Sequence, residues 1–328
     1  MLTRRPLPPR PRRGFSLIEV LVVIAIIGIL AAMSAGAMFR LRAAQTTSNT
    51  EGTLSKLHGL MATRWSAVLD GAKKTVPVDL IDRCGGDKER AGSVWAYASL
   101  KNEFPTTFLE ATTAIDLGGG VKLQPRGIFK AVSTNNGATY IATQTPTAEQ
   151  QSAALFYVAI TQGGNQGNAA GSDGSNQQVG GTDVVDTAAM SPKPVVSLPV
   201  YKDGWGTHVI FVRNASFGEI GAAPYMKANA VPLQGGGTLT VKNPLDPMGR
   251  LLVRTGNPWA STAPTNGYRT TMLTGLGLAD FTNENFLPTL VSAGANKQFG
   301  TQYFDVVADD SADNLLSYRL RREGDKGN

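Results

Sequence analysis

The hydrophobic pattern near the N-terminus predicts one long helix with two different halves. From Phe15 to Phe39, Glu19 is the only residue with a formal charge. A helix of this length would span about 37 Å, more than the roughly 30 Å hydrocarbon core of a bilayer. Apolar residues then recur every three or four positions up to Gly71, which predicts an amphipathic continuation whose apolar face packs on a globular domain. This stripe consists of Leu54, Leu57, Met61, Trp65 and Val68.

Beyond this helix, helical and strand-like patterns alternate. Helix is expected on either side of Pro105 within residues 93–110, and a capped helix over 153–160 is expected after Thr147 and Gln150. Short apolar runs separated by turn residues predict an antiparallel meander, covered on one face by the amphipathic helix. The expected strands are 121–123, 128–132, 195–200, 208–213, 238–242, 250–254, 289–292, 303–307 and 315–320. The expected fold class is therefore α+β.

These patterns divide the chain into consecutive segments. We expect a basic leader at 1–14, a transmembrane helix at 15–39, its amphipathic continuation at 40–71 and a variable middle segment at 72–194. A C-terminal antiparallel β region at 195–322 and a tail at 323–328 follow. Within the middle segment, residues 161–182 are rich in Gly, Asn and Gln, a composition typical of a surface loop.

The charge distribution argues against a nucleic-acid partner. The formal net charge is +6, from 31 Lys+Arg and 25 Asp+Glu. Removing the first 14 residues, which contain five arginines and no acidic residue, leaves 26 − 25 = +1. The basic excess therefore belongs to the leader, which is expected to stay in the cytoplasm. These arginines are Arg4, Arg5, Arg10, Arg12 and Arg13.

Residues that could support catalysis are sparse. The single cysteine, Cys84, cannot form an intrachain disulfide, and His58 and His208 lack the spaced cysteines typical of a zinc site. The sequence contains no Gly-x-Ser-x-Gly, His-Glu-x-x-His or P-loop pattern. We therefore expect no catalytic residue, and a free structural or surface thiol at Cys84.

The position of Glu19 separates three interpretations of the N-terminus. An ionised carboxylate near the centre of a bilayer costs roughly 2.5–3.5 kcal/mol, so a sequence that keeps one there should supply a partner. One interpretation is a secretory signal, cleaved after the small residues at 31–32 or 35–37. Another is a simple signal anchor. Neither of these two interpretations explains why the apolar segment contains the carboxylate of Glu19.

The third interpretation rests on a family resemblance. The segment Arg13–Glu19, RGFSLIE, followed by a long apolar helix, resembles the processing site of type IV pilins and type II secretion pseudopilins. The resemblance implies a type IV pilin-like fold, cleavage between Gly14 and Phe15 by a prepilin peptidase, and methylation of the new amine of Phe15. It also implies that the carboxylate of Glu19 pairs with the amine of a neighbouring subunit and sets the register between helices.

Two turns and a loop in the C-terminal part extend the resemblance. Residues 201–207 are similar to the turn that opens the C-terminal sheet of major pseudopilins, and 243–249 look like a second, degenerate turn. The loop at 290–300 resembles one that holds a structural calcium ion in several pseudopilins. Asn296 and Lys297 stand where the family has Asp and Gly, so solvated turn residues are the alternative. The calcium ligands implied by the resemblance are Asn296, Asp309, Asp310 and Asp313.

The expected function is that of a subunit of a type II secretion pseudopilus or a type IV pilus-like filament, without enzymatic activity. The expected partners are other pilin or pseudopilin subunits, the prepilin peptidase, an inner-membrane platform protein and an assembly ATPase. The chain is expected to cross the inner membrane once, with its globular domain outside the cytoplasm. A membrane-anchored surface adhesin or binding module with the same anchor is the alternative, and an anchored periplasmic enzyme is a third. The long middle segment favours a specialised subunit, whereas the C-terminal turns resemble those of the major one.

Overall fold

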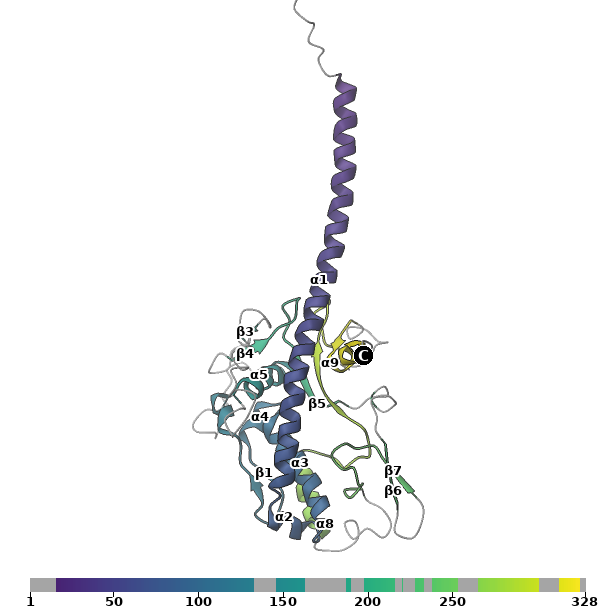
Figure 1. Ribbon diagram of the computed structural model, residues 1–328. Coiled ribbons are helices and arrows are strands. Elements are labelled where there is room, and N and C mark those ends of the chain that lie inside the picture. Colours follow the sequence, from purple (N-terminus) through teal and green to yellow (C-terminus); the bar gives the residue numbers. More distant parts are fainter. Residues whose placement is uncertain are drawn as a thin grey trace, which may run out of the picture. The chain divides into compact units, whose positions relative to one another are not determined.

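The chain forms two units, Met1–Ser48 and Asn49–Asn328. The computed structural model describes residues 16–132, 146–162, 187–189, 198–215, 220, 228–232, 238–252, 265–300 and 313–324. The first unit contains the N-terminal part of helix α1, and the second contains the remainder of α1 with the other described elements (Figure 1).

Helix α1 (Leu17–Lys74) is a single helix of 58 residues. Its large apolar side chains are exposed as far as Leu41, whereas Leu54, Leu57 and Met61 are fully buried. The predicted amphipathic face is therefore confirmed. The helix continues past the expected end at Gly71 and stops before Pro77, since the residue that precedes a proline disfavours helical geometry.

Polar contacts also join α1 to the second unit's other elements. Thr50 Oγ1 accepts a hydrogen bond from Gly204 N at 2.9 Å. Further along the helix, His58 Nδ1 lies 2.9 Å from Ser317 Oγ. Both contacts connect α1 to the C-terminal part of the chain, as the fold prediction requires.

Between α1 and β3 (Thr187–Ala189), the described residues contain four α-helices. They are α2 (Val78–Arg83), α3 (Lys88–Glu103), α4 (Phe108–Thr112) and α5 (Ala148–Gln162). Pro105 separates α3 from α4, as expected, and the Asp87 side chain caps α3 by accepting a hydrogen bond from Arg90 N at 3.0 Å. At the start of α5, Gln150 N donates to Thr147 Oγ1 at 3.4 Å and Thr147 N donates to Gln150 Oε1 at 3.1 Å. This reciprocal capping box confirms the predicted helix start.

Residues 115–132 contain a short hairpin followed by a 3₁₀ helix. Strand β1 (Ile115–Asp116) pairs antiparallel with β2 (Lys122–Leu123). The prediction of a strand at 128–132 is wrong, because these residues belong to the 3₁₀ helix η1 (Gly127–Val132). Phe129 is 1% exposed and its N–H donates to Arg126 O at 3.1 Å, so a tight turn buries the ring. A short apolar run does not by itself distinguish a strand from a buried turn.

The remaining strands that the structure describes pair antiparallel, but they do not form a meander. They are β3 (Thr187–Ala189), β4 (Pro199–Tyr201), β5 (Ile210–Ala215), β6 (Asn229–Pro232), β7 (Thr238–Val241), β8 (Leu287–Ser292) and β9 (Leu315–Leu316). Strand β5 pairs with the distant β8, which pairs with β9, whereas β3–β4 and β6–β7 form separate pairs. The expected class, α+β with a long N-terminal helix, is confirmed, and the expected strand order is wrong.

Two further strand predictions fail for local reasons. Residues 250–252 form no strand, because the Asp246 carboxylate accepts hydrogen bonds from Arg250 N at 2.7 Å and Leu251 N at 2.8 Å and holds a turn. Of residues 315–320, only the first two form a strand, β9, and the helix α9 (Ser317–Gly324) begins directly after it. Neither α9 nor the helix α8 (Thr265–Leu276) was predicted from the sequence. The strand expected at 303–307 lies outside the described residues. So does the loop expected at 161–182, apart from the end of α5.

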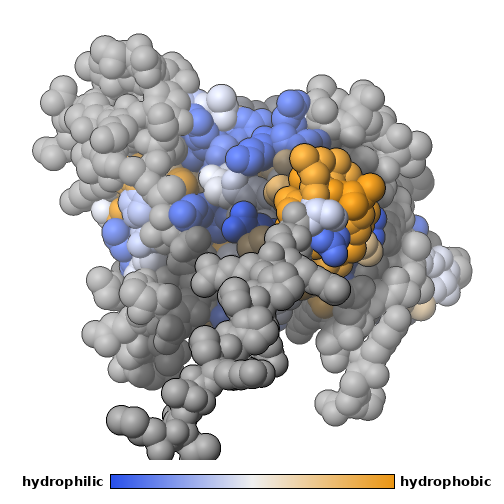
Figure 2. Space-filling model, turned by 90° about the horizontal axis from the view of Figure 1, so that it is seen from above, coloured by the Kyte–Doolittle hydropathy of each residue, from blue (hydrophilic) through white to orange (hydrophobic). Residues whose placement is uncertain are grey.

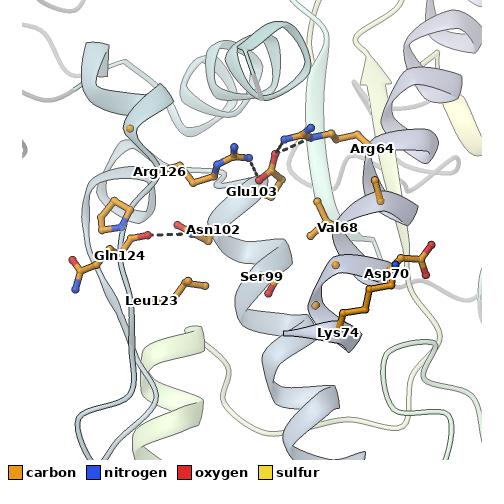
Figure 3. Close-up of a pocket in the computed structure, with 15 residues that line it drawn as sticks. Arg64, Val68, Asp70, Lys74, Ser99, Asn102, Glu103, Leu123, Gln124 and Arg126 are labelled. Atoms are coloured by element: carbon orange, nitrogen blue, oxygen red, sulfur yellow. Dashed lines mark hydrogen bonds and ion pairs between the residues drawn. The ribbon is translucent and has the colours of Figure 1, made fainter. Parts of the chain in front are cut away.

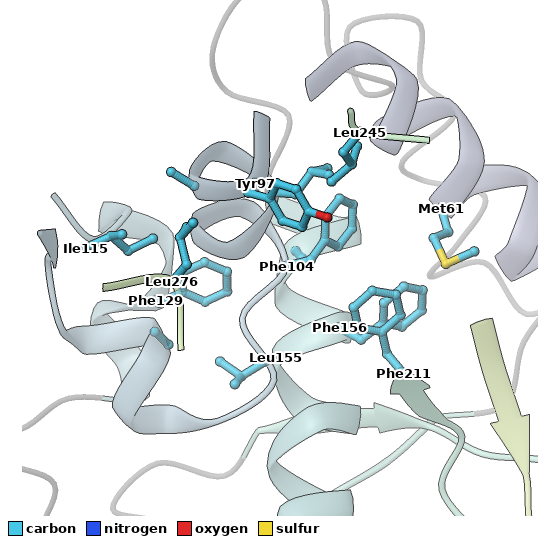
Figure 4. Close-up of a cluster of buried hydrophobic side chains, with 14 of the residues drawn as sticks. Met61, Tyr97, Phe104, Ile115, Phe129, Leu155, Phe156, Phe211, Leu245 and Leu276 are labelled. Carbon is cyan, nitrogen blue, oxygen red and sulfur yellow. The ribbon is translucent and has the colours of Figure 1, made fainter. Parts of the chain in front are cut away.

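The two faces of the sheet β5-β8-β9 pack against different clusters. Phe211 faces the main core, in which its ring stacks on Phe156 of α5 with centroids 5.2 Å apart. Figure 4 shows these two rings together, with Met61 of α1 pointing toward them. The adjacent Ile210 belongs to a smaller cluster with Tyr318 of α9. Helix α5 therefore packs on this face of the sheet, and α1 contributes Leu54, Leu57 and Met61 to the same core.

Candidate functional site

The beginning of α1 is closed by a capping box. Ser16 N donates a hydrogen bond to Glu19 Oε2 at 2.8 Å, and Glu19 N donates to Ser16 Oγ at 3.2 Å. In this arrangement a serine and a glutamate three residues later satisfy two backbone N–H groups that lack helical partners. The glutamate inside the apolar run therefore has a partner within its own chain.

The N-terminal part of α1 exposes a long apolar surface. Its most apolar stretch of 18 residues has a mean hydropathy of 2.7, and none of it is buried. Figure 2 shows these residues as a hydrophobic surface around the helix. The apolar core helix of a soluble protein is buried, so a fully exposed one is suited to lipid or to other apolar helices.

The sequence before and within this helix matches a family model. Residues 9–35 match the prokaryotic N-terminal methylation motif. The chain has a prepilin-type N-terminus. This motif marks a structural subunit that a prepilin peptidase processes and that assembles with other pilin subunits. No curated protein and no solved structure matches the chain.

The prepilin-type N-terminus contains the residues predicted for processing and assembly. Gly14 and Phe15 lie outside the described residues, so cleavage and methylation stay predictions, as does the assembly role of Glu19. The pairing of Ser16 with Glu19 was not among the predictions from the sequence. A Ser-x-x-Glu pattern directly before an apolar run was the available signal.

The turn at 201–207 is built around a buried carboxylate. Asp203 is 2% exposed, and its Oδ1 accepts hydrogen bonds from Trp205 N at 3.0 Å and Thr207 N at 2.8 Å. Its Oδ2 accepts a hydrogen bond from Ser292 Oγ at 2.6 Å. Burial raises the pKa of Asp203, and these hydrogen bonds oppose that effect. The turn therefore connects the start of β5 to the end of β8, a structural role.

The predicted calcium ligands are described only in part. Asn296 N donates to Asp313 Oδ2 at 2.9 Å, so these two residues are brought together. Asp309 and Asp310 lie outside the described residues. Within the described part of the chain, no three His, Cys, Asp or Glu side chains are grouped so that they could hold a metal ion. The calcium site stays a prediction.

Cys84 is a buried free thiol. It is 0% exposed, and burial raises the pKa of its thiol to about 12. A nucleophilic cysteine needs an accessible thiolate, which this environment disfavours. The adjacent backbone is fixed as well, since Arg90 Nη1 donates to Cys84 O at 2.8 Å. These properties fit the structural thiol expected from the sequence.

Proposed function

We propose that this chain is a subunit of a type II secretion pseudopilus or a type IV pilus-like filament. The observation that carries the proposal is the methylation motif at 9–35, which runs into an exposed apolar helix. In this function the prepilin peptidase cleaves between Gly14 and Phe15 and methylates the amine of Phe15. A platform protein and an assembly ATPase then supply the energy that draws the subunit into the filament.

The proposed location is the inner membrane, with residues 15–39 crossing it once. The arginines that precede the apolar segment favour the cytoplasmic side for the N-terminus. The second unit, Asn49–Asn328, would then lie on the outer side of the membrane.

The proposed role of Glu19 begins after cleavage. Removal of residues 1–14 leaves an ammonium group at Phe15, close to the carboxylate of Glu19 in the sequence. Each charge is costly alone in an apolar helix bundle, and the two are tolerated together. The carboxylate of one subunit therefore pairs with the amine of the next and sets the helix register, while Ser16 keeps the carboxylate at the start of the helix.

Intact mass and N-terminal sequencing of the membrane-purified protein test the processing step. The expected product begins at Phe15 and carries one additional methyl group on its amine. A Gly14→Val variant should remain at precursor length because the residue before the cleaved bond has changed. A mature chain that begins near residues 35–38 would identify an ordinary signal peptide and refute the proposal.

The substitution Glu19→Gln tests the assembly step. Glutamine also forms a capping box, so this change removes the charge and keeps the helix cap. The matched control is Ser16→Ala, which removes one capping hydrogen bond and keeps the charge. We expect Glu19→Gln to stay in the membrane but to lose filament incorporation, measured by shearing and electron microscopy, whereas Ser16→Ala still assembles. If Glu19→Gln assembles into filaments as well as the native chain does, the role of Glu19 is limited to capping the helix.

Deletion of the chain in its native host tests the secretion role against the adhesin alternative. Cargo retained inside the cell indicates a secretion pseudopilin. Intact secretion combined with lost surface attachment indicates an adhesin.

A further inference from the structure

The apolar part of α1 has the length of one membrane crossing between its charged ends. Twenty consecutive residues, 20–39, carry no formal charge, and they separate Glu19 from Arg40. At 1.5 Å per residue these two residues are about 32 Å apart along the helix, or about 30 Å across a membrane at the usual tilt of about 20°. This distance matches the hydrocarbon core of a bilayer, which is about 30 Å thick. With Glu19 at the inner boundary of the core, Arg40 therefore reaches the outer boundary.

Two arginines mark the outer end of this span. The side chains of Arg40 and Arg42 are exposed, and within the described part of the chain neither guanidinium group has a carboxylate partner. The acidic residues nearest to them in the sequence are Glu19 and Glu51, and Glu51 is nine residues beyond Arg42. Residues 20–50 contain these two arginines, no lysine and no acidic residue, so their side chains carry a formal charge of +2.

The directions of the two side chains favour lipid over a protein partner. Successive residues of an α-helix are about 100° apart, so Arg40 and Arg42 project about 200° apart, on nearly opposite sides of α1. Side chains two positions apart do not face the same neighbour. A single packed helix can therefore meet only one of them, whereas lipid headgroups surround a membrane helix on all sides. Phe39 and Leu41, each 71% exposed, add apolar surface for acyl chains at the same level of α1.

The proposed cleavage changes the balance of charge between the two ends of the span. In the precursor, the five leader arginines outnumber the two at the outer end and favour the inner side for the N-terminus. Removal of residues 1–14 takes all five away. Arg40 and Arg42 are then the only cationic side chains within residues 15–55. The depth of the mature helix therefore depends on what these two arginines contact.

We propose that Arg40 and Arg42 bind the headgroup phosphates of anionic phospholipids in the outer leaflet and fix the depth of the helix before filament assembly. This inference rests on the proposed function, because it requires the membrane span and its orientation. An arginine side chain keeps its apolar stem near the acyl chains while its guanidinium group forms bidentate, charge-assisted hydrogen bonds with phosphate. Held at this depth, α1 keeps the carboxylate of Glu19 at the inner boundary, within reach of headgroups and water, until the subunit enters the filament.

Lipid selectivity at the outer end of the helix tests the proposal. The full-length chain carries a bimane label on Met38→Cys, next to the arginines, in phosphatidylcholine vesicles that also contain acyl-brominated phosphatidylglycerol or acyl-brominated phosphatidylcholine. Bromine quenches nearby fluorophores, so the two quenching curves give the relative affinity of the two lipids for this end of α1. Phosphatidylglycerol should bind about fivefold more tightly, which corresponds to about 1 kcal/mol for an arginine near an anionic surface, and added salt should reduce this preference. Cys84 is buried, so the chain without the added cysteine is the labelling blank.

Two double variants and a second label locate the contact. Arg40→Gln combined with Arg42→Gln should remove the preference for phosphatidylglycerol, whereas Arg40→Lys combined with Arg42→Lys should keep most of it because the charge remains. Lys56→Gln is the matched control, because it removes an exposed cation of the same helix outside the span and should leave the preference unchanged. A bimane label on Leu21→Cys, at the inner end, should give the same result in the native chain and in the double Gln variant.

The outcomes separate this inference from the proposed function. If the native chain shows no preference at Met38→Cys, or if the double Gln variant keeps it, the lipid contact is refuted and the prepilin-type function is unaffected. Such a result would favour carboxylates of neighbouring subunits as the partners of the two arginines. If neither lipid quenches either label, α1 does not span the bilayer, and the proposed location is refuted together with this inference.

Discussion

Replacing Glu110 with glutamine should destabilise the second unit at neutral pH and have little effect in strong acid. The Glu110 side chain is 21% exposed and forms a bidentate pair with Arg213, at 3.0 and 3.1 Å. Lys101 Nζ lies 3.5 Å away, and Thr106 N donates to the same carboxylate at 2.9 Å. Burial alone would raise the pKa of Glu110, but these groups, Arg213 foremost, lower it to about 2.

The size and sign of the effect follow from that pKa. A reduction of the pKa of Glu110 from 4.5 to about 2, at 1.36 kcal/mol per pKa unit, corresponds to about 3 kcal/mol in the free energy of unfolding. Because the folded pKa lies below the unfolded value, this contribution is fully present above about pH 4.5 and is lost as the pH falls toward 2. Glutamine cannot ionise, so Glu110→Gln removes the contribution at pH 7, and its difference from the native chain should narrow steadily below pH 4.5.

Urea unfolding of the full-length chain in detergent, followed by tryptophan fluorescence from pH 2 to 7, measures this difference. Glu89→Gln is the control, because Glu89 is 60% exposed and pairs with Arg250 at 3.5 Å on the surface. It should change the free energy of unfolding by less than about 1 kcal/mol. A Glu110→Gln effect that is the same at pH 2.5 and pH 7, or no larger than that of the control, would refute the reasoning.

Three further predictions concern the core of the second unit. Phe156→Ala should lower the free energy of unfolding by about 3–5 kcal/mol in urea titrations, because Phe156 is 1% exposed and stacks on Phe211; a loss below about 1 kcal/mol would contradict this packing. Cys84 should resist iodoacetamide at pH 8 in the native chain and react after unfolding, as measured by mass, because its thiol is buried and has its pKa raised to about 12; rapid native labelling would contradict its burial. Gly275→Ala should lower the free energy of unfolding by about 1–3 kcal/mol, because an added Cβ would overlap the carbonyl oxygen of Asp116; unchanged stability would contradict this close approach.

Local signals predicted the parts of this fold that depend on local chemistry. The spacing of Leu54, Leu57 and Met61 identified the buried face of α1, because helical periodicity and burial coincide there. Thr147 and Gln150 marked the start of α5, because a capping box involves neighbouring residues only. The motif around Glu19 identified the prepilin-type N-terminus for the same reason.

Features that depend on distant residues could not be predicted in this way. The apolar runs at 128–132 and 315–320 looked like strands, yet burial of Phe129 in one and the smaller cluster around Tyr318 in the other favour helical turns. Glu103 contacts both Arg64 and Arg126, which are 39 and 23 residues away from it in the sequence (Figure 3). No local pattern places these three side chains together.

Contacts between α1 and the other elements of the second unit recur on successive turns of the helix, and this spacing has a mechanical consequence. Thr50, Leu54, Leu57, Met61 and Arg64 each contact other elements, over about 21 Å of helix at 1.5 Å per residue. A force along the axis of this part of α1 would therefore load these contacts together as shear and would not break them one by one. We therefore expect the second unit to keep its fold while tension acts along α1.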